Sequence, residues 1–209
     1  MSNDLQTMRH LQQENIRLRS ENSGVKSHLL RVQQGIRALI DLQDNLDTIT
    51  SDTHVYSLLN NILFAALNAV DSTDGSLLLM DDETEELVFV DVIGEARDTL
   101  MNYRISVNDG VVGWVARNKE PRLVEDVKRS SMFSSRVDQD TGFKTTSLIC
   151  VPLVDGARVL GVLEVVNTRT GRPFGEGDMD IMILVARLAS IAIARLEETA
   201  ASEGGNTPD

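Results

Sequence analysis

Cysteine and histidine are scarce in this sequence, and their scarcity excludes most kinds of reactive site. Among 209 residues there are one cysteine and three histidines. A single thiol, Cys150, cannot form an internal disulfide or a cysteine-based zinc site. His10, His28 and His54 all fall in the first quarter of the chain, so none is expected near a site built on the later strands. We expect no catalytic residues, no metal and no resident cofactor, and we predict that the chain is not an enzyme.

Positive charge and long apolar runs are also in short supply. Lys and Arg number 20 against 32 Asp and Glu, a formal net charge of -12. Such a surface repels nucleic-acid phosphates and anionic lipids, so neither is expected as a partner. The longest apolar run begins at Ile181 but is interrupted by Arg187 and Arg195, which leaves it too short to span a bilayer. The polar first residues do not resemble a signal peptide, and we expect a cytoplasmic protein.

A heptad repeat occupies residues 1–50. Leucine or valine stands at every d position, namely Leu11, Leu18, Val25, Val32, Leu39 and Leu46, and the a positions are then Met8, Asn15, Asn22, Leu29, Ile36 and Gln43. Such a seam has to meet another helix, and asparagine at a favours a parallel two-stranded register. We therefore predict a parallel coiled coil that forms a homodimer. The alternative is one amphipathic helix lying on its own domain.

Charged residues beside the seam favour the same arrangement. Glu14 at g would face Arg19 at e of the second helix, and Glu21 would face Lys26. Exposed pairs of this kind stabilise little, so they select orientation more than they add stability. Gly24 and Gly35 each lower helix stability by roughly 1 kcal/mol relative to alanine, and the coil is expected to bend there.

Residues 51–198 are predicted to form one α+β domain, and residues 199–209 a disordered tail. The expected elements are a helix capped by Asp52 or Thr53 and reaching Val70, strands Ser76–Met80, Leu87–Val92 and Tyr103–Val107, a helix Val111–Asn118 capped by Asn108 or Asp109, strands Arg122–Val124, Ser147–Val154 and Val159–Val166, and a helix from Gly177 to Glu198. From Ile181 to Ala194 the last helix is apolar nearly all round. It must be covered on more than one side, by its own sheet and by a second subunit.

Several motifs, in this order and spacing, resemble those of GAF domains. They are Gly110-Val111-Val112-Gly113-Trp114-Val115-Ala116, then Pro121, Asp138 and Thr141-Gly142-Phe143-Lys144-Thr145, then Ser147 to Leu153 and Gly161 to Asn167. The resemblance covers about residues 53–197. It implies the GAF fold, an antiparallel sheet with helices packed on one face and a small-molecule pocket on the other. It also implies dimers that form through the terminal helices and an adjoining coiled coil.

Within that family the sequence looks most like the cyclic-nucleotide-binding branch of phosphodiesterases and bacterial adenylate cyclases. The resemblance implies a pocket hydroxyl at Ser76, backbone amides at Val111 and Val112 close to the cyclic phosphate, and a carboxylate at the pocket floor, Glu164. It implies that Asp138, Thr141 and Thr145 belong to a lid over the ribose and phosphate. Phe133 stands beside Ser134, the position where an aromatic side chain often covers the ligand.

Read without the resemblance, these residues support a pocket to different degrees. Glu164 interrupts an otherwise apolar run, Val159–Val166, and a carboxylate buried there needs a partner. The alternative is a position that faces solvent. Thr141 and Thr145 lie four apart and would share a face if the loop is helical, or they are ordinary loop hydroxyls.

The sequence departs from the branch in one motif, which pairs Asn-Lys with a later Phe-x-x-x-Asp-Glu. Asn167, Phe174 and Asp178 are present, but Thr168 replaces the lysine and Met179 replaces the glutamate. Arg169 or Arg172 could supply the missing cation for Asp178.

These patterns predict a dimeric GAF-domain signalling protein that binds a small molecule, with cAMP or cGMP as the leading candidate. It would relay binding through its terminal helices and coiled coil to a protein output partner. The alternative is a non-enzymatic scaffold or partner-binding dimer with a vestigial pocket.

Overall fold

A long helix precedes a domain of mixed helices and strands. The computed structural model describes residues 2–47 and 55–204; the predicted caps Asp52 and Thr53 lie outside them. The long helix is α1 (Ser2–Asp47), and the domain begins with α2 (Val55–Ala69). The remaining elements are β1 (Ser72–Asp81), β2 (Glu86–Ile93), α3 (Arg97–Leu100), β3 (Arg104–Ser106), α4 (Gly110–Asn118), β4 (Arg122–Val124), η1 (Val127–Arg129), α5 (Arg136–Thr141), β5 (Leu148–Asp155), β6 (Arg158–Thr168) and α6 (Glu176–Gly204).

The strands form one antiparallel sheet in the order β3-β2-β1-β6-β5-β4. The two hairpins, β1 with β2 and β5 with β6, are joined through the central pair β1 and β6. In that central register Ser76 on β1 lies opposite Glu164 on β6, and Cys150 on β5 lies opposite Glu164 from the other side. These pairings place three polar side chains together in the middle of the sheet.

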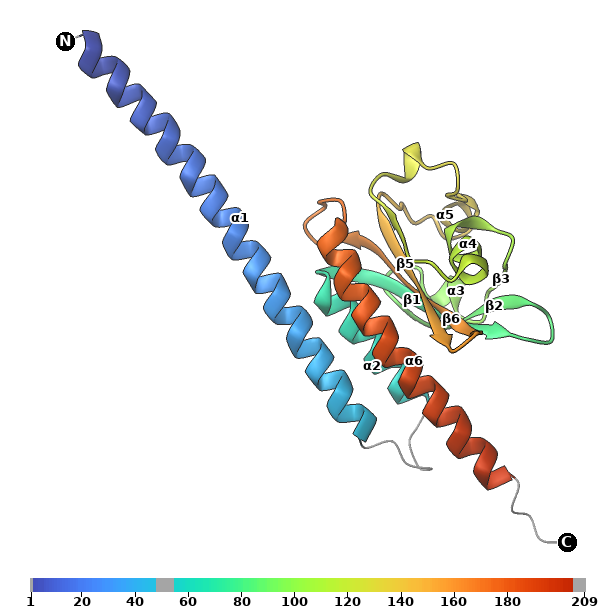
Figure 1. Cartoon of the computed structure of the whole chain (residues 1–209). Coiled ribbons are helices and arrows are strands. Elements are labelled where there is room, and N and C mark those ends of the chain that lie inside the picture. The colour runs from blue at the N-terminus through green and yellow to red at the C-terminus, as the bar shows by residue number, and fades with distance from the viewer. Residues whose placement is uncertain (1, 48–54, 205–209) are drawn as a thin grey trace, which may run out of the picture.

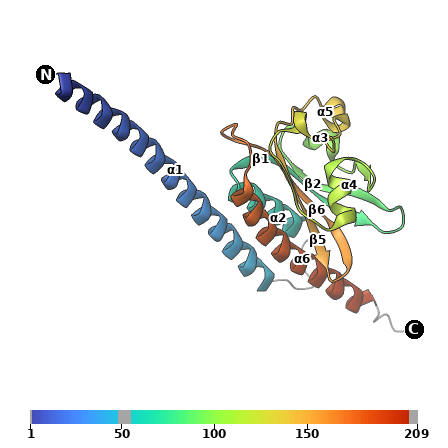
Figure 2. The same cartoon turned by 45° about the horizontal axis from the view of Figure 1, so that its top comes forward.

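Helices cover both faces of the sheet, and each face has its own core. The helices α2 and α6 pack on one face, while α3, α4 and α5 lie on the other (Figures 1 and 2). Because side chains alternate along a strand, β6 contributes to both cores. Leu163 and Val165 pack against the α2 and α6 side, and Val162 packs toward α4. The α+β fold with an antiparallel sheet is as predicted. The helices α2 and α6 form the expected helical face, and the short helices α3, α4 and α5 on the opposite face are additional to it.

Three short helices were not predicted, and the last helix is longer than expected. The helices α3, η1 and α5 each span six residues or fewer, too short to show a helical apolar period. The helix α6 continues to Gly204, so residues 199–204, assigned to the disordered tail, are helical. The intervening residues Thr199-Ala200-Ala201-Ser202-Glu203 contain good helix formers and no proline to end the helix. Residues 205–209 lie outside the described part.

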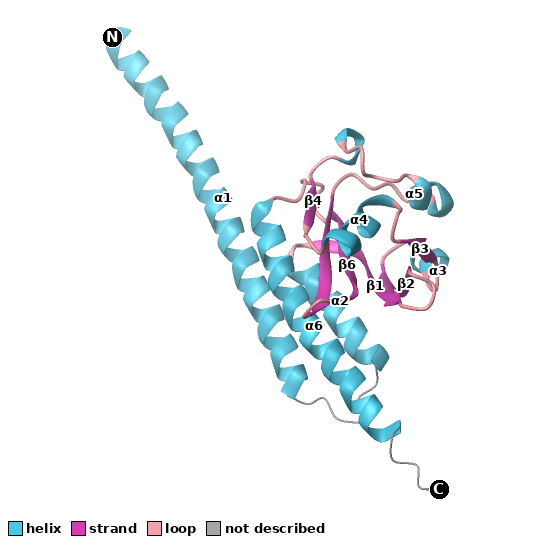
Figure 3. Cartoon of the chain, turned by 45° about the vertical axis from the view of Figure 1, so that its right-hand side comes forward, coloured by secondary structure: helices cyan, strands magenta, loops and turns pink. Residues whose placement is uncertain are grey.

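The helix α1 divides into a part that packs and a part that projects. Its C-terminal half lies beside α2 and α6, and its N-terminal half extends beyond the domain (Figure 3). Six described seam residues are between 51% and 62% exposed in the single chain: Met8, Leu11, Leu18, Val25, Leu29 and Ile36. The side chains of Val32, Leu39, Gln43 and Leu46 are outside the described set. The C-terminal half of α1 thus contacts its own domain, while its described seam residues Val25, Leu29 and Ile36 remain exposed in the single chain.

In the single chain both glutamates beside the seam already have partners on their own helix. Arg17 donates from Nε and Nη2 to Glu14, at 3.1 and 2.5 Å, and from Nη1 to Glu21 at 2.9 Å. The predicted pairs with Arg19 and Lys26 of a second helix would therefore compete with Arg17. Within residues 2–47 and 55–204, no helix combines the length and the apolar character that a membrane span requires.

Candidate functional site

A cavity of about 90 Å³ lies between the sheet and the helices α4 and α5. It is lined by all eight residues predicted as ligand-binding: Ser76, Val111, Val112, Phe133, Asp138, Thr141, Thr145 and Glu164. Sequence reasoning missed most of the apolar wall, which includes Phe89, Val92, Leu100, Ile105, Val137, Phe143, Leu148 and Val166. Those residues look like ordinary core positions in the sequence, because walls and cores are built from the same residue types.

Glu164 forms the floor of the cavity at the centre of the sheet. Its carboxylate accepts hydrogen bonds from the Ser76 hydroxyl at 3.2 Å and from the Cys150 thiol at 3.3 Å. Burial raises the pKa of the Glu164 carboxyl, hydrogen bonds from Cys150 and Ser76 lower it, and the charge of Asp138 raises it. The side chain therefore faces the cavity, and its partners come from both neighbouring strands.

Cys150 lies beneath this floor and is fully buried. Burial, followed by the nearby charge of Glu164, raises the pKa of the Cys150 thiol well above its ordinary value. A thiol in that state is a hydrogen-bond donor and a poor nucleophile.

The first turn of α4 forms the wall that contains Val111 and Val112. The turn begins at Gly110, whose φ of +62° suits glycine. At Gly113 a Cβ would lie 2.5 Å from the Val107 carbonyl oxygen, so glycine lets the helix approach the preceding loop. Asp109 occupies the N-cap position, as predicted, but its side chain makes no capping hydrogen bond. The positive end of the α4 dipole therefore points at the cavity without a carboxylate bonded to it.

The segment between β4 and β5, residues 125–147, covers the cavity and is called the lid below. Asp138 and Thr145, both in the lid, are hydrogen-bonded to each other. The Asp138 carboxylate accepts hydrogen bonds from the Thr145 amide at 2.9 Å and from the Thr145 hydroxyl at 2.7 Å. The hydroxyl of Tyr103 donates to Asp140 at 3.2 Å and ties α5 to the segment before β3.

Thr141 and Thr145 do not share a helical face, so the condition under which they would lie on one face is not met. The helix α5 ends at Thr141, and Gly142 follows in the left-handed conformation. The Thr141 hydroxyl turns back to donate to the Val137 carbonyl at 2.8 Å, and it accepts from the Phe143 amide at 3.1 Å. Both threonines line the cavity, but through a turn and not through a shared helix face.

Asn167 lies outside the cavity and anchors the end of the lid to the sheet. Its Oδ1 accepts from the amide and the hydroxyl of Thr146, at 2.8 and 2.7 Å. Its Nδ2 donates to the Lys144 carbonyl at 2.9 Å. The residue has a φ of +53°, a conformation that asparagine tolerates better than most residues.

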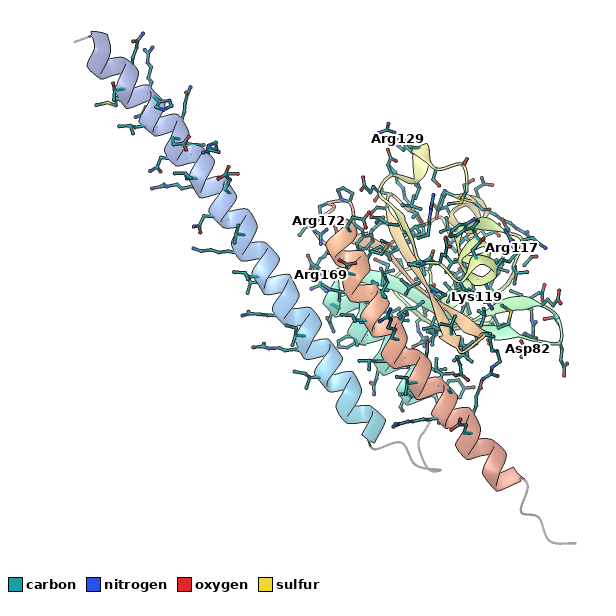
Figure 4. The ribbon with its side chains drawn as sticks, viewed as in Figure 1. Asp82, Arg117, Lys119, Arg129, Arg169 and Arg172 are labelled. Atoms are coloured by element: carbon teal, nitrogen blue, oxygen red, sulfur yellow. The ribbon has the colours of Figure 1, made fainter. Side chains whose placement is uncertain are left out.

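Phe174 and Asp178 also lie outside the cavity, at the start of α6. Phe174 is buried in the core beneath α2 and α6, and its amide donates to the Ser147 hydroxyl at 3.4 Å. Asp178 forms a two-pronged ion pair with Arg172, at 2.6 and 2.9 Å. Of the two candidate cations, Arg172 thus pairs with Asp178, whereas Arg169 lies 3.9 Å from Asp71. Both arginines lie in the loop that leads into α6 (Figure 4).

The lining of the cavity is acidic. It contains the carboxylates of Asp74, Asp109, Asp138 and Glu164, and no Lys, Arg or His appears among the described lining residues. The acids are not arranged as a metal site, since no group of three or more potential ligands is placed to hold an ion in the described part of the chain. Apart from the Ser76 and Thr145 hydroxyls and the backbone, the positive end of α4 is the electropositive element of the site.

The chain belongs to the GAF domain family, whose model matches residues 52–194. The cone cGMP-specific 3′,5′-cyclic phosphodiesterase subunit alpha′ of Mus musculus is 38% identical over 90 residues, which are 43% of this chain and 10% of that protein. The dual 3′,5′-cyclic-AMP and -GMP phosphodiesterase 11A of Takifugu rubripes is 29% identical over 164 residues, which are 74% of this chain and 18% of that protein. The chain thus spans less than a fifth of the length of either relative.

The fold is also found in solved GAF domains. The GAF domain of a phosphoenolpyruvate-protein phosphotransferase from Coxiella burnetii superposes with a TM-score of 0.70 at 16% identity. The match covers 81% of this chain and 98% of that one. At this identity the likeness establishes the fold, and the ligand has to be argued from the residues of the cavity.

The raised pKa of Glu164 predicts a pH-dependent contribution to stability. The folded state holds this proton more tightly than the unfolded chain, so the contribution is complete below the ordinary glutamate pKa of about 4.3 and is lost as pH rises through the raised value. Glu164→Gln removes that titration. The free energy of unfolding of the wild type minus that of the variant should therefore fall as the pH rises above about 4.3 in urea titrations.

Glu83→Gln is the matched control, because Glu83 is exposed in the turn between β1 and β2. The difference in free energy of unfolding between the wild type and Glu83→Gln should stay constant over the same pH range. A wild-type advantage over Glu164→Gln that grows with pH would contradict the argument.

The ion pair at the start of α6 predicts unequal roles for two neighbouring arginines. Arg172→Met leaves Asp178, whose side chain is 7% exposed, without its cationic partner and should lower the free energy of unfolding by about 1–3 kcal/mol. Arg169→Met removes a long pair from a side chain that is 59% exposed and should cost less than about 1 kcal/mol. Chemical denaturation measures the free energy of unfolding that each variant loses relative to the wild type. Equal losses in the two variants would show that the Arg172 ion pair stabilises the fold no more than the exposed Arg169 pair does.

Proposed function

We propose that the chain is the sensory unit of a signalling protein and that its cavity binds a cyclic nucleotide, cAMP or cGMP. The observation that carries the proposal is the convergence of Ser76, Val111, Val112, Phe133, Asp138, Thr141, Thr145 and Glu164 on one cavity. These residues come from β1, α4, the lid and β6, and they are the positions to which the family resemblance points. The two phosphodiesterases to which the chain is similar carry cyclic nucleotides in their names.

The chemistry of the cavity suits the parts of such a ligand. The first turn of α4 offers backbone N–H groups and a positive dipole to a cyclic phosphate. Phe133 and Phe143 supply apolar surface for a base, and Glu164 with Ser76 supplies polar groups at the floor. The hydroxyls of Thr141 and Thr145 stand on the lid side, where they can reach ribose or phosphate oxygens.

Binding would require the lid to open and close. The cavity of about 90 Å³ is smaller than the roughly 300–1,000 Å³ of pockets that hold ligands of this size. The Tyr103 bond to Asp140 holds the lid in this position, and the Asp138 bonds to Thr145 fix the shape of the lid itself. A ligand that exchanges these bonds for its own would shift the population of lid positions.

A route for relay runs from the end of the lid to the terminal helix. Asn167 holds Lys144 and Thr146, and Ser147 accepts from the Phe174 amide. The backbone amide of Gly175, the residue after Phe174, donates a hydrogen bond to the Asp178 carboxylate in the first turn of α6. A change in lid position would therefore act on the residues that fix the start of α6, which in turn lies beside α1.

We further propose that the occupant of the α1 seam is a second copy of this chain, in parallel register. A hollow on α1 is lined by Asn15, Leu18, Arg19 and Asn22, with Ser23 and Lys26 at its edge. Positions a, d, e and the next a form the hole that receives a d side chain in a parallel coiled coil. Glu14 and Glu21 on one flank and Arg19 and Lys26 on the other make the two copies complementary in charge. This arrangement supports the proposed homodimer, and the coil is the surface on which we place the proposed protein output partner.

A scaffold with a vestigial pocket is the second candidate function, and the exposed α1 seam is the observation that favours it. In that case the coil would dock a partner whether or not the cavity is filled. Ligand binding separates the two candidates, whereas dimerisation is common to both.

The sensor proposal predicts measurable binding by calorimetry on the full chain. At least one of cAMP and cGMP should bind, and Thr141→Ala and Glu164→Ala should each weaken binding by about tenfold or more, as expected for losing one or two polar contacts. Thr84→Ala, in the exposed turn between β1 and β2, should bind like the wild type. No heat with either nucleotide, together with no ligand released on denaturation, would rule out the sensor proposal and favour the scaffold.

The coiled-coil proposal predicts that asparagine sets the register. The wild type should sediment as a dimer. A Gln12→Cys variant should form a disulfide between the two copies, as a parallel coil requires, and Cys150 is too buried to interfere. The double change Asn15→Val with Asn22→Val should produce additional registers or oligomers, because buried asparagine limits both at some cost in stability. A monomeric wild type would overturn the dimer, and a double variant with one unchanged register would overturn the role of the asparagines.

A further inference from the structure

We propose that the cavity selects nucleotides carrying no more than one negative charge, and that Asp109 is the residue that sets this limit. The inference rests on the proposed function, since it assumes that the α4 end of the cavity takes the ligand phosphate. It adds a rule of specificity: a cyclic phosphodiester, with one charge, is accepted, and the corresponding 5′-phosphomonoester, with two, is rejected.

The first ground is the charge balance of the lining. Four carboxylates border the cavity, and no cationic side chain is found among its described lining residues. The fixed dipole at the start of α4 is worth roughly half an elementary charge. One phosphate charge can be matched in part by that dipole and by amide hydrogen bonds, while a second has nothing to offset the surrounding acids.

The second ground is that three of the four acids already accept hydrogen bonds from the protein. Asp74 accepts from the Glu95 amide at 3.1 Å, and Asp138 accepts twice from Thr145. Glu164 accepts from Ser76 and Cys150 at the floor, away from α4. These bonds spread or neutralise part of each charge, so these acids repel a phosphate at α4 less than a free carboxylate would.

Asp109 differs from them in both position and contacts. It is the residue immediately before α4, and it is one of the lining residues, yet its carboxylate makes no hydrogen bond to the first-turn amides. It therefore adds a negative charge beside the donors that a phosphate would use, without occupying them. The repulsion acts on each phosphate charge, so the unfavourable electrostatic energy between Asp109 and a dianionic phosphate is about twice that for a monoanionic one. Asp109 is thus a specificity residue that leaves room for a phosphate and penalises its second charge.

The test compares cGMP, 5′-GMP and guanosine, and the matching adenine series, by calorimetry on the full chain at about pH 8. At that pH a phosphomonoester is a dianion, because its second pKa is near 6. In the wild type the 5′-nucleotide should bind at least about tenfold more weakly than the cyclic nucleotide. In Asp109→Asn the ratio should shrink by about threefold or more, chiefly because the 5′-nucleotide gains affinity.

Asp82→Asn is the matched control, since it changes net charge by the same amount at an exposed hairpin turn outside the cavity (Figure 4). It should leave the ratio of the two affinities unchanged. Asp109→Ser provides a second variant that also suits a helix N-cap, and both variants are checked for wild-type thermal unfolding. The pair of variants separates charge from shape, because a purely steric rejection of 5′-GMP would not respond to Asp109→Asn.

The outcomes distinguish this inference from the function on which it rests. If the cyclic nucleotide binds but 5′-GMP binds equally well, or if Asp109→Asn and Asp109→Ser change the ratio no more than Asp82→Asn does, the charge rule is wrong and the sensor proposal stands. If neither series binds at all, guanosine and adenosine included, the proposed function fails and the charge rule fails with it.

Discussion

The pairing of β1 with β6 at the centre of the sheet is the constraint on which the rest of the structure depends. Both strands are covered on both faces, so the alternation of side chains decides which residues meet the helices and which meet the cavity. A slip of one residue would turn Glu164 into the core beneath α2 and α6. The register instead brings Ser76 and Cys150 to either side of its carboxylate, and this contact makes a polar cavity floor tolerable in the middle of a buried sheet.

The same sheet connects the cavity to the ends of the chain. One face of β6 carries Glu164 and the other packs Leu163 and Val165 against the helices. At its end, Asn167 holds the last residues of the lid. The lid, the sheet and the first turn of α6 thus share a small set of hydrogen bonds, and α6 lies in one layer with α2 and the C-terminal half of α1. In the relay that we propose, a change at the lid would act on the terminal helices through these direct contacts.

The sequence was informative where a repeating pattern or a distinctive motif existed, and silent where neither did. Strand-like apolar runs predicted the strands of both hairpins, and an apolar run preceded by a capping residue predicted α4. The cavity residues beside α4 were implied by the family resemblance. The helix α5 escaped prediction because its six residues, with Val137 as the one apolar side chain, are too few to show a helical period. Arg17 could not be foreseen as the partner of both Glu14 and Glu21, because helical spacing allows this pairing as well as a pairing across two helices. The special position of Asp109 depends on a side-chain orientation that no sequence pattern encodes.

The central claim is that residues from β1, α4, the lid and β6 form one ligand cavity whose lid responds to its occupant. Hydrogen–deuterium exchange of the full chain, with and without saturating cGMP or cAMP, tests this claim most directly because it reports local opening of backbone amides. The claim predicts slower exchange on binding in residues 136–147 and in the first turn of α4, with a smaller change at the start of α6. Unchanged exchange in the lid despite measured binding, or protection confined to α1, would contradict it.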